Sequence, residues 1–161
     1  VTLPTLELTF QVLDIPAHTR GHVAYYNDAW VFCGDTLFTA GCGRLFEGTA
    51  EQMYHALSQL AALPAETEVY CGHEYTEANL RFATTVEPKN ADILERITVT
   101  QQLRAQGKPT VPASLALEKR TNPFLLCDVP EVIAAASAHA QTSLKTPVDV
   151  LRVLRLWKDQ F

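Results

Sequence analysis

Three side chains that can bind a metal ion each lie in a turn directly after a run of strand-forming residues. They are His18, Asp35 and His73. Because the ends of neighbouring strands share one edge of an α/β sheet, residues just past those ends can meet there. Two imidazoles and one carboxylate are donors suited to Zn²⁺, Fe²⁺ or Mn²⁺. A single histidine in such a turn is more often an ordinary loop residue, but the threefold repetition predicts a metal site.

Composition limits the remaining possibilities. The chain has 161 residues, 47% of them apolar, which is enough to form one domain or slightly more with a real core. Its net charge of −5 argues against nucleic acid as the main partner. No apolar run approaches the length of a membrane-spanning helix and the start does not resemble a signal peptide, so a cytoplasmic protein is expected.

The four cysteines contain no C-x-x-C pair and are expected to be reduced packing residues. Cys33 and Cys71 each stand two residues before a presumed metal ligand. Both thiols are therefore expected near the metal site.

The first part of the chain alternates strand-like runs with loops and helices. Strands are predicted for residues 8–15, 22–27, 30–34 and 67–72, where β-branched and aromatic residues dominate. Asn27-Asp28 predicts a hairpin turn between the second and third of these strands.

Two helices are predicted within the first part. A capping box, Thr49-Ala-Glu-Gln52, predicts the first of them, and the second is expected directly after His73. Past Pro88 the chain shows helical patterns only, and three further helices are predicted over residues 91–106, 129–140 and 146–161. The chain is therefore expected to divide into parts 1–88 and 89–161.

Five segments of the chain together resemble one enzyme family over nearly the whole sequence. The segments are HTRGH, CGDTLFTAGCGRLFEGTAEQM, VYCGHEYTEANLRFA, VEPKNADI and the terminal RLWKDQF. On these segments the chain resembles glyoxalase II, the hydroxyacylglutathione hydrolase of the metallo-β-lactamase fold.

The resemblance implies an α/β fold in which residues 1–88 form the second half of an αββα sandwich. Residues 89–161 would form a helical, glutathione-binding part. Members of this family carry an H-x-H-x-D-H motif, which this sequence lacks. The chain therefore looks like the C-terminal two-thirds of such an enzyme, and its opening at Val1 without a methionine fits a processed or excised piece.

The resemblance further implies a site with two divalent metals, zinc with iron or manganese as alternatives. His18 would bind one metal, His73 the other, and Asp35 would bridge them and their shared hydroxide. His22 is expected to support the site without binding metal. Because half of the family's ligands are absent, reduced or absent metal occupancy is expected in this chain alone.

The implied reaction is hydrolysis of S-2-hydroxyacylglutathione thioesters, with S-D-lactoylglutathione giving D-lactate and glutathione. This is the second step of methylglyoxal detoxification. The metal-bridging hydroxide would attack the thioester carbonyl. By resemblance, the residues expected to bind substrate are Arg44, Phe46, Tyr75, Arg155 and Lys158. Phe46 occupies a position where some members have tyrosine, so one hydroxyl contact is absent.

Two other functions stay open from the sequence. One is an inactive fragment that binds glutathione without turning it over. The other is a persulfide dioxygenase-like enzyme with a single iron. Partners are expected to be the glutathione thioester and either the missing N-terminal half or a second copy of the chain, which would cover an exposed sheet face.

Overall fold

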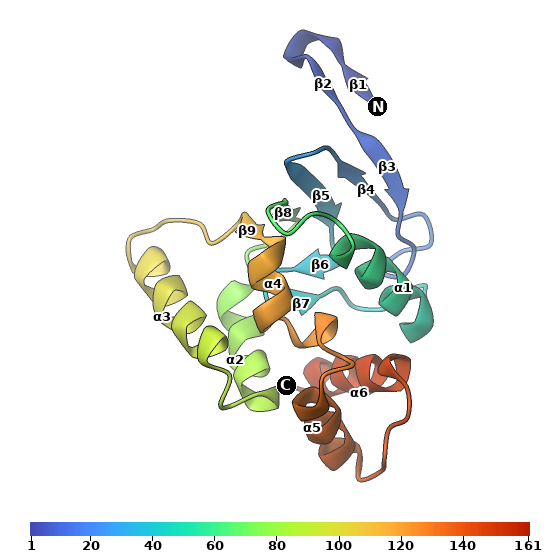
Figure 1. Ribbon diagram of the computed structural model, residues 1–161, viewed down its shortest axis with the longest axis vertical. Helices are drawn as coiled ribbons and strands as arrows, with labels where there is room; N and C mark the ends of the chain where they lie inside the picture. Colours follow the sequence, from blue (N-terminus) through green and yellow to red (C-terminus); the bar gives the residue numbers. More distant parts are fainter.

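The computed structural model describes all residues 1–161 and places one central five-stranded sheet beside six α-helices (Figure 1). Its strands run in the order β3-β4-β5-β8-β9. The pair β5–β8 is parallel, whereas the other neighbouring pairs are antiparallel. The strands are β3 (Gln11–Asp14), β4 (Val23–Tyr26), β5 (Trp30–Gly34), β8 (Glu68–Cys71) and β9 (Ala113–Ser114).

One face of this sheet forms the main core. Tyr26, Val31 and Val69 are paired in register across three strands and are all buried. They belong to the same apolar cluster as Met53 and Leu57 of helix α1 (Ala50–Ala61), which covers this face. Because side chains alternate between the two faces of a strand, the next residue along each strand lies on the opposite face.

The predicted capping box at the start of α1 is confirmed. The Thr49 hydroxyl accepts a hydrogen bond from the Gln52 backbone N–H at 3.2 Å, and the Gln52 side chain accepts from the Thr49 N–H at 2.9 Å. The predicted turn after β4 is also present. There the Asn27 side chain accepts from the backbone N–H groups of Ala29 and Trp30.

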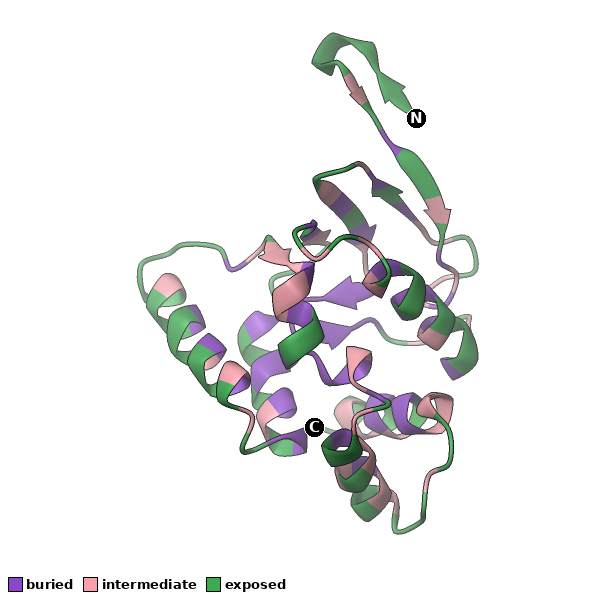
Figure 2. Ribbon diagram, viewed as in Figure 1, coloured by how far each residue is buried: buried purple, intermediate pink, exposed green.

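Helices dominate the chain after β8, as expected. Figure 2 shows buried residues interspersed with exposed ones along these helices, so each helix has a buried side and an exposed side. No helix is both long and apolar enough to cross a membrane. The helices are α2 (Thr76–Val86), α3 (Ala91–Ala105), α4 (Leu115–Thr121), the 3-10 turn η2 (Pro123–Leu125), α5 (Pro130–Ala140) and α6 (Pro147–Asp159).

Two elements of the second part were not predicted. Helix α4 has seven residues, too few for a helical period to stand out in the sequence, and its signal is the N-cap Ser114, whose hydroxyl accepts from the Leu117 N–H. The short strand β9 adds an antiparallel edge beside β8, so the second part also contributes to the sheet. The division of the chain at residue 88 stays a prediction.

The strand predicted for residues 8–15 is broken into two. Only β3 joins the main sheet, while β2 (Leu8–Thr9) pairs with β1 (Thr2–Leu3) in a separate hairpin that projects away from the body (Figure 1). Phe10 closes this hairpin by donating its N–H to the Val1 carbonyl at 2.7 Å. Because β4 offers only four residues for pairing, it matches Gln11–Asp14 and leaves the earlier residues to the hairpin.

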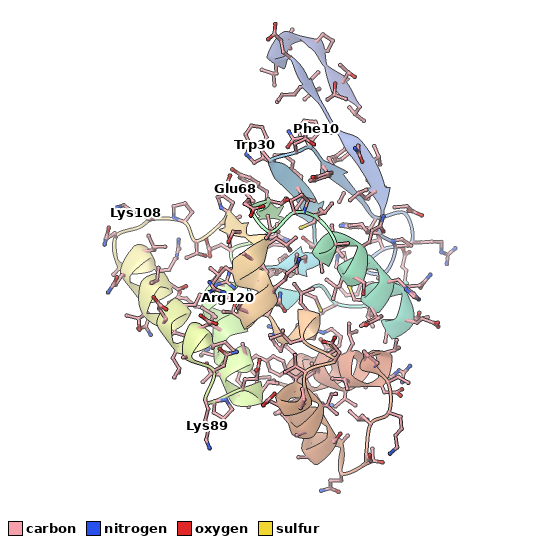
Figure 3. The ribbon with its side chains drawn as sticks, viewed as in Figure 1. Phe10, Trp30, Glu68, Lys89, Lys108 and Arg120 are labelled. Atoms are coloured by element: carbon pink, nitrogen blue, oxygen red, sulfur yellow. The ribbon has the colours of Figure 1, made fainter.

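The second face of the sheet is uncovered. Val12, Tyr25, Phe32 and Tyr70 are paired in register across four strands on this face, and the Phe32 and Tyr70 rings stack at 4.9 Å. The N-terminal hairpin extends the apolar surface into a groove of about 380 Å³ lined only by hydrophobic residues. Figure 3 labels two of them, Phe10 and Trp30, at the hairpin end of the sheet.

We predict that the 161-residue chain associates with a second copy of itself through this face, because uncovered apolar patches of this kind favour association. Phe32→Lys should shift the chain toward monomer in sedimentation velocity at micromolar concentration. Leu94→Lys is the matched control, since Leu94 is 47% exposed on α3 and Phe32 is 39% exposed. A wild-type chain that sediments only as monomer would contradict the prediction.

Candidate functional site

Asp35 follows β5 directly and lies where two parallel strands end side by side. The Gly72 N–H donates to the Gly34 carbonyl at 2.9 Å, so the turns after β5 and β8 run against each other. A Cβ at residue 72 would lie 2.3 Å from the Asp35 carboxylate, so only glycine allows this approach. The parallel pairing therefore brings the residues after both strands to one place.

His18 and His73 both contact Asp35. The distances from Asp35 Oδ2 to the Nε2 atoms are 3.5 Å for His18 and 3.4 Å for His73. No three metal-binding side chains in the chain form a group shaped to hold a single ion. The three predicted ligands therefore meet in pairs through the shared carboxylate and do not form a three-donor cage around one ion.

The orientation of His18 leaves its Nε2 lone pair facing the carboxylate. Its Nδ1 lies 2.8 Å from the Arg44 carbonyl oxygen, and because a carbonyl only accepts, Nδ1 carries the proton. In the neutral ring Nε2 is then an unprotonated acceptor directed at the acceptor Oδ2 of Asp35. Two facing acceptors repel unless a proton or a metal cation lies between them, and the hydrogen bond from the other ring nitrogen to a carbonyl is typical of metal-binding histidines. The donor set therefore fits a divalent metal.

His22 supports Asp35 from behind. The Asp35 backbone N–H points to His22 Nε2 at 3.2 Å, and the same nitrogen lies 3.2 Å from the Cys33 carbonyl. The His18 and His22 rings approach edge to face at 5.7 Å. The position of His22 thus fits the supporting role expected from the sequence.

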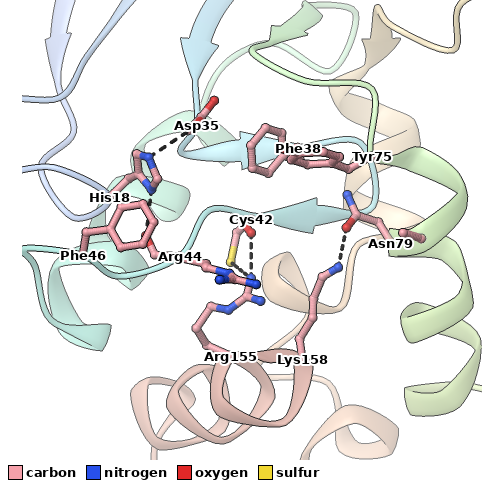
Figure 4. A pocket seen from close by; sticks show the side chains of 11 residues that line it. His18, Asp35, Phe38, Cys42, Arg44, Phe46, Tyr75, Asn79, Arg155 and Lys158 are labelled. Carbon is pink, nitrogen blue, oxygen red and sulfur yellow. Dashed lines mark hydrogen bonds and ion pairs between the residues drawn. The ribbon is translucent and has the colours of Figure 1, made fainter. Parts of the chain in front are cut away.

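A pocket of about 540 Å³ extends from Asp35 to helix α6 (Figure 4). One end carries the carboxylate and His18, and the other end carries the cations of α6. The lining residues are His18, Asp35, Phe38, Cys42, Arg44, Phe46, Tyr75, Ala78, Asn79, Arg155 and Lys158.

Arg155 reaches the pocket from α6 but is held by the protein. It is 5% exposed, and its guanidinium donates to the Cys42 carbonyl at 2.7 Å and to the Asp159 carboxylate at 3.2 Å. The Phe124 ring lies 5.3 Å below it. Its Nε is buried without an acceptor, so one donor of the buried guanidinium stays unsatisfied in the protein.

Lys158 lies one helical turn after Arg155 and donates to the Asn79 side-chain oxygen. Burial and the nearby positive charge of Arg155 lower the pKa of Lys158 to about 8. An anion in the pocket would stabilise both cations. Figure 4 shows the two side chains entering the pocket side by side.

Arg44, Phe46 and Tyr75 lie at the pocket rim. The Arg44 guanidinium lies 3.5 Å from Asp159 and is largely exposed. The Phe46 ring is 67% exposed and packs against His18 at 4.9 Å, whereas Tyr75 stacks on His73 at 4.9 Å. All five residues expected to bind substrate thus line the same pocket.

Sequence reasoning missed Asn79, Phe38 and Cys42 as pocket residues. Asn79 follows Tyr75 by four residues in helical register, with its N–H bound to the Tyr75 carbonyl, so helical spacing could have revealed it. Phe38 and Cys42 lie on β6 (Leu37–Phe38) and β7 (Gly41–Cys42), a two-stranded hairpin too short to recognise from the sequence.

The thiols expected near the metal site point to backbone carbonyls. Burial raises the pKa of Cys33 to about 12, and its Sγ donates to the Leu37 carbonyl at 3.2 Å. Burial also raises the pKa of Cys71, whose Sγ donates to the His73 carbonyl at 3.4 Å. Both thiols therefore pack beside the site, and burial disfavours the thiolate form that binds metal.

Two family profiles match the chain and meet at the turn that carries His73. Residues 74–161 match the hydroxyacylglutathione hydrolase C-terminus, and residues 3–73 match the metallo-β-lactamase superfamily. The first of these covers more than half of the chain.

Similar proteins agree with these matches. A hydroxyacylglutathione hydrolase of Nitrosomonas eutropha is 52% identical over all 161 residues, and one of Methylobacillus flagellatus is 54% identical over 159 residues. The chain spans 63% and 62% of the lengths of these two relatives.

Solved structures support the same fold. ETHE1 from Myxococcus xanthus aligns with a TM-score of 0.53 and 28% identity over 90% of this chain and 44% of its own. The BLEG-1 B3 metallo-β-lactamase aligns with a TM-score of 0.51 and 25% identity over 78% of this chain and 44% of its own. The sequence matches and the fold together show that this chain belongs to the hydroxyacylglutathione hydrolase family of the metallo-β-lactamase superfamily.

Proposed function

We propose that this chain contributes to the active site of a thioester hydrolase that converts S-D-lactoylglutathione to D-lactate and glutathione, the second step of methylglyoxal detoxification. The observation that carries the proposal is the polarity of the pocket. Asp35 with two imidazoles lies at one end and the cations of α6 lie at the other. A glutathione thioester has the matching polarity, with a reacting carbonyl at one end and peptide carboxylates at the other.

His18, Asp35 and His73 would hold two divalent metals, with Asp35 shared between them. When bound, such a pair lowers the pKa of a water molecule and stabilises negative charge on the reacting oxygen. Zinc suits the donors, with iron or manganese as alternatives. Because each metal would gain one imidazole and a shared carboxylate from this chain, we propose that the 161-residue chain alone holds metal weakly.

The chain's own residues would bind and orient the substrate. Lys158 would bind a glutathione carboxylate directly, since partial burial strengthens anion binding. The buried Arg155 beside it would add positive charge while its bonds to Cys42 and Asp159 fix the wall of the pocket. The Arg44 guanidinium and the Tyr75 hydroxyl at the rim would contact the tripeptide. Phe46 has no hydroxyl to offer and would add only an apolar wall beside His18.

A glutathione-binding fragment without turnover is the second candidate. The observation that favours it is that this chain supplies only one imidazole and the shared Asp35 carboxylate to each metal. The names of the relatives favour a hydrolase over the dioxygenase alternative. Thioester hydrolysis by the 161-residue chain alone distinguishes the hydrolase from the inactive glutathione-binding fragment.

Removing the shared carboxylate should abolish turnover. In a protein extended to the length of its relatives with an H-x-H-x-D-H segment, we expect Asp35→Ala to lower kcat by about three orders of magnitude or more, since both metals lose a ligand. Thiol release from S-D-lactoylglutathione measures this rate, and the unextended chain should show little of it. Near-normal kcat in Asp35→Ala would show that the two-metal hydrolase reading is wrong.

Removing a cation of α6 should weaken substrate binding more than chemistry. In the same extended protein, Lys158→Ala should raise KM by about tenfold or more with a smaller change in kcat, because the lost charge-assisted hydrogen bond lies far from the reacting carbon. Arg155→Ala should also lower Tm, because it removes the bond to Cys42. Arg152→Ala is the control, as its exposed guanidinium pairs with Asp149 away from the pocket. Equal KM values for the Lys158 and Arg152 variants would contradict the assignment.

Substrate binding should weaken as pH rises through about 8. Lys158 carries its charge below its folded-state pKa of about 8 and loses it above, whereas an ordinary lysine stays charged past about 10. Calorimetric titration with S-methylglutathione, whose blocked thiol does not ionise, should show a larger Kd at about pH 9 than at about pH 7. In Lys158→Arg, which stays charged, the pH dependence should be flatter. The same profile in both proteins would exclude Lys158 as its origin.

A further inference from the structure

The turn between β6 and β7 is held almost entirely by side chains from distant helices. This turn comprises residues 38–41, and in it Ala40 adopts a left-handed conformation with φ of 56°. Such a conformation is unfavourable for a residue with a Cβ, so it persists only where other contacts enforce it. The turn lies between Asp35, which follows β5, and helix α6, which carries Arg155 and Lys158.

Asn122, the residue between the end of α4 and the start of η2, binds two carbonyls of the turn. Its side-chain nitrogen donates to the Phe38 oxygen at 3.2 Å and to the Gly41 oxygen at 3.0 Å. Its side-chain oxygen accepts from the Phe124 N–H at 3.1 Å, so the amide is anchored in η2 while it holds the turn. Asn122 is completely buried, so water cannot replace these bonds.

Two further side chains bind the remaining groups of the turn. The Ala40 N–H donates to the Glu118 carboxylate at 2.9 Å, and the Thr39 carbonyl accepts from Asn79 at 2.9 Å. Glu118 is completely buried, and its charge is balanced by an ion pair with the buried Arg96. Four consecutive residues are thus bound by side chains from α2, α4 and the start of η2.

The turn of residues 38–41 connects both ends of the pocket. Phe38 enters the pocket from the turn, and the Cys42 carbonyl, directly after it, accepts from Arg155. Beyond Cys42, the Gly43 N–H donates to the Thr36 carbonyl at 3.1 Å, next to Asp35. Asn79 binds the turn and Lys158 with the same amide. A shift of the turn would therefore change the spacing between the carboxylate end and the cation end.

We propose that Asn122, together with Glu118 and Asn79, positions this turn so that the pocket has a fixed length, which selects a tripeptide thioester over a shorter one. This role rests on the proposed function, because it assumes the glycine carboxylate of glutathione at α6. The γ-glutamylcysteine dipeptide lacks the terminal glycine, so its C-terminal carboxylate lies about 3.5 Å closer to the sulfur, one residue of extended chain. That C-terminal carboxylate therefore does not reach the cations when the sulfur lies near Asp35.

Asn122→Ser is the sharpest test of the clamp, by which we mean the hydrogen bonds from Asn122, Glu118 and Asn79 to the turn. Serine still accepts from the Phe124 N–H as an N-cap residue, but it is too short to reach the two carbonyls. Glu118 is less suitable, because its replacement leaves the buried Arg96 charge without a partner. Ala40→Gly is the rescue, because glycine adopts a positive φ without enforcement. Leu57→Val in α1 is the control for a general loss of stability, since Leu57 is a buried apolar residue whose side chain makes none of the hydrogen bonds to the turn.

The ligand measurement compares S-methylglutathione with S-methyl-γ-glutamylcysteine by calorimetry. Wild type should bind the tripeptide about tenfold or more tightly, the value of a charge-assisted hydrogen bond. In Asn122→Ser this ratio should fall to about threefold or less, and Ala40→Gly in the same chain should restore it. Leu57→Val should lower Tm while keeping the wild-type ratio. A ratio that Asn122→Ser leaves unchanged would overturn the proposal, because a purely structural residue affects both ligands equally.

Amide hydrogen exchange separates failure of the clamp from failure of the proposed function. In Asn122→Ser without ligand, exchange at Ala40 and Cys42 should accelerate while exchange in β5 and β8 stays slow. Unchanged exchange in the turn overturns the clamp, whatever the ligands do. Faster exchange in a chain whose wild type binds neither peptide overturns the glutathione pocket, and the length-selecting role with it.

Discussion

The parallel pairing of β5 with β8 is the contact on which the site depends. Parallel strands end on the same side of the sheet, so the residues after both strands emerge together. Asp35 and His73 therefore meet at 3.4 Å although they lie far apart in the sequence. The absence of a side chain at Gly72 lets the two turns touch, and any larger residue would push the carboxylate away. The pocket, its lining and its polarity are all arranged around this meeting point.

The helical part completes the site through polar contacts with short loops. Buried Glu118 and Asn122 hold the turn between β6 and β7, while Thr110 holds the Glu74 carboxylate directly after His73 through its N–H at 2.9 Å and its hydroxyl. Such contacts are costly to leave unmade in a buried setting, so they specify one arrangement of the loops. The helices thus determine the shape of a site whose proposed metal ligands all come from the part before α2.

The cations of α6 are only partly available to a ligand. Arg155 already binds Cys42 and Asp159, so its main contribution is to fix the wall of the pocket, whereas Lys158 binds only the neutral Asn79. Burial makes the charged form of Lys158 less stable, and a bound carboxylate would offset this desolvation free energy. This difference explains why the two variants are expected to differ in stability although they share one helix face.

The sequence by itself determined the family and most of the longer local elements, and it predicted most of the residues that line the pocket. Runs of β-branched and aromatic residues predicted the strands around Tyr25 and Phe32, and the capping box predicted the start of α1. The positions of His18, Asp35 and His73 directly after strands indicated a shared edge. These features depend on a few neighbouring residues, so they can be recognised in the sequence without knowledge of the fold. The metal-binding role of the three residues stays a prediction.

Only the tertiary structure decided which distant groups meet. The split of the first strand, the helix α4, and the roles of Asn79, Asn122 and Glu118 depend on partners up to 84 residues away. A buried asparagine in the sequence looks the same whether it caps a helix, holds a turn or does both. The residue type says that a side chain can form hydrogen bonds, but only the fold decides which distant groups it reaches. The bonds that hold the turn, and with them the fixed length of the pocket, therefore follow from the tertiary structure.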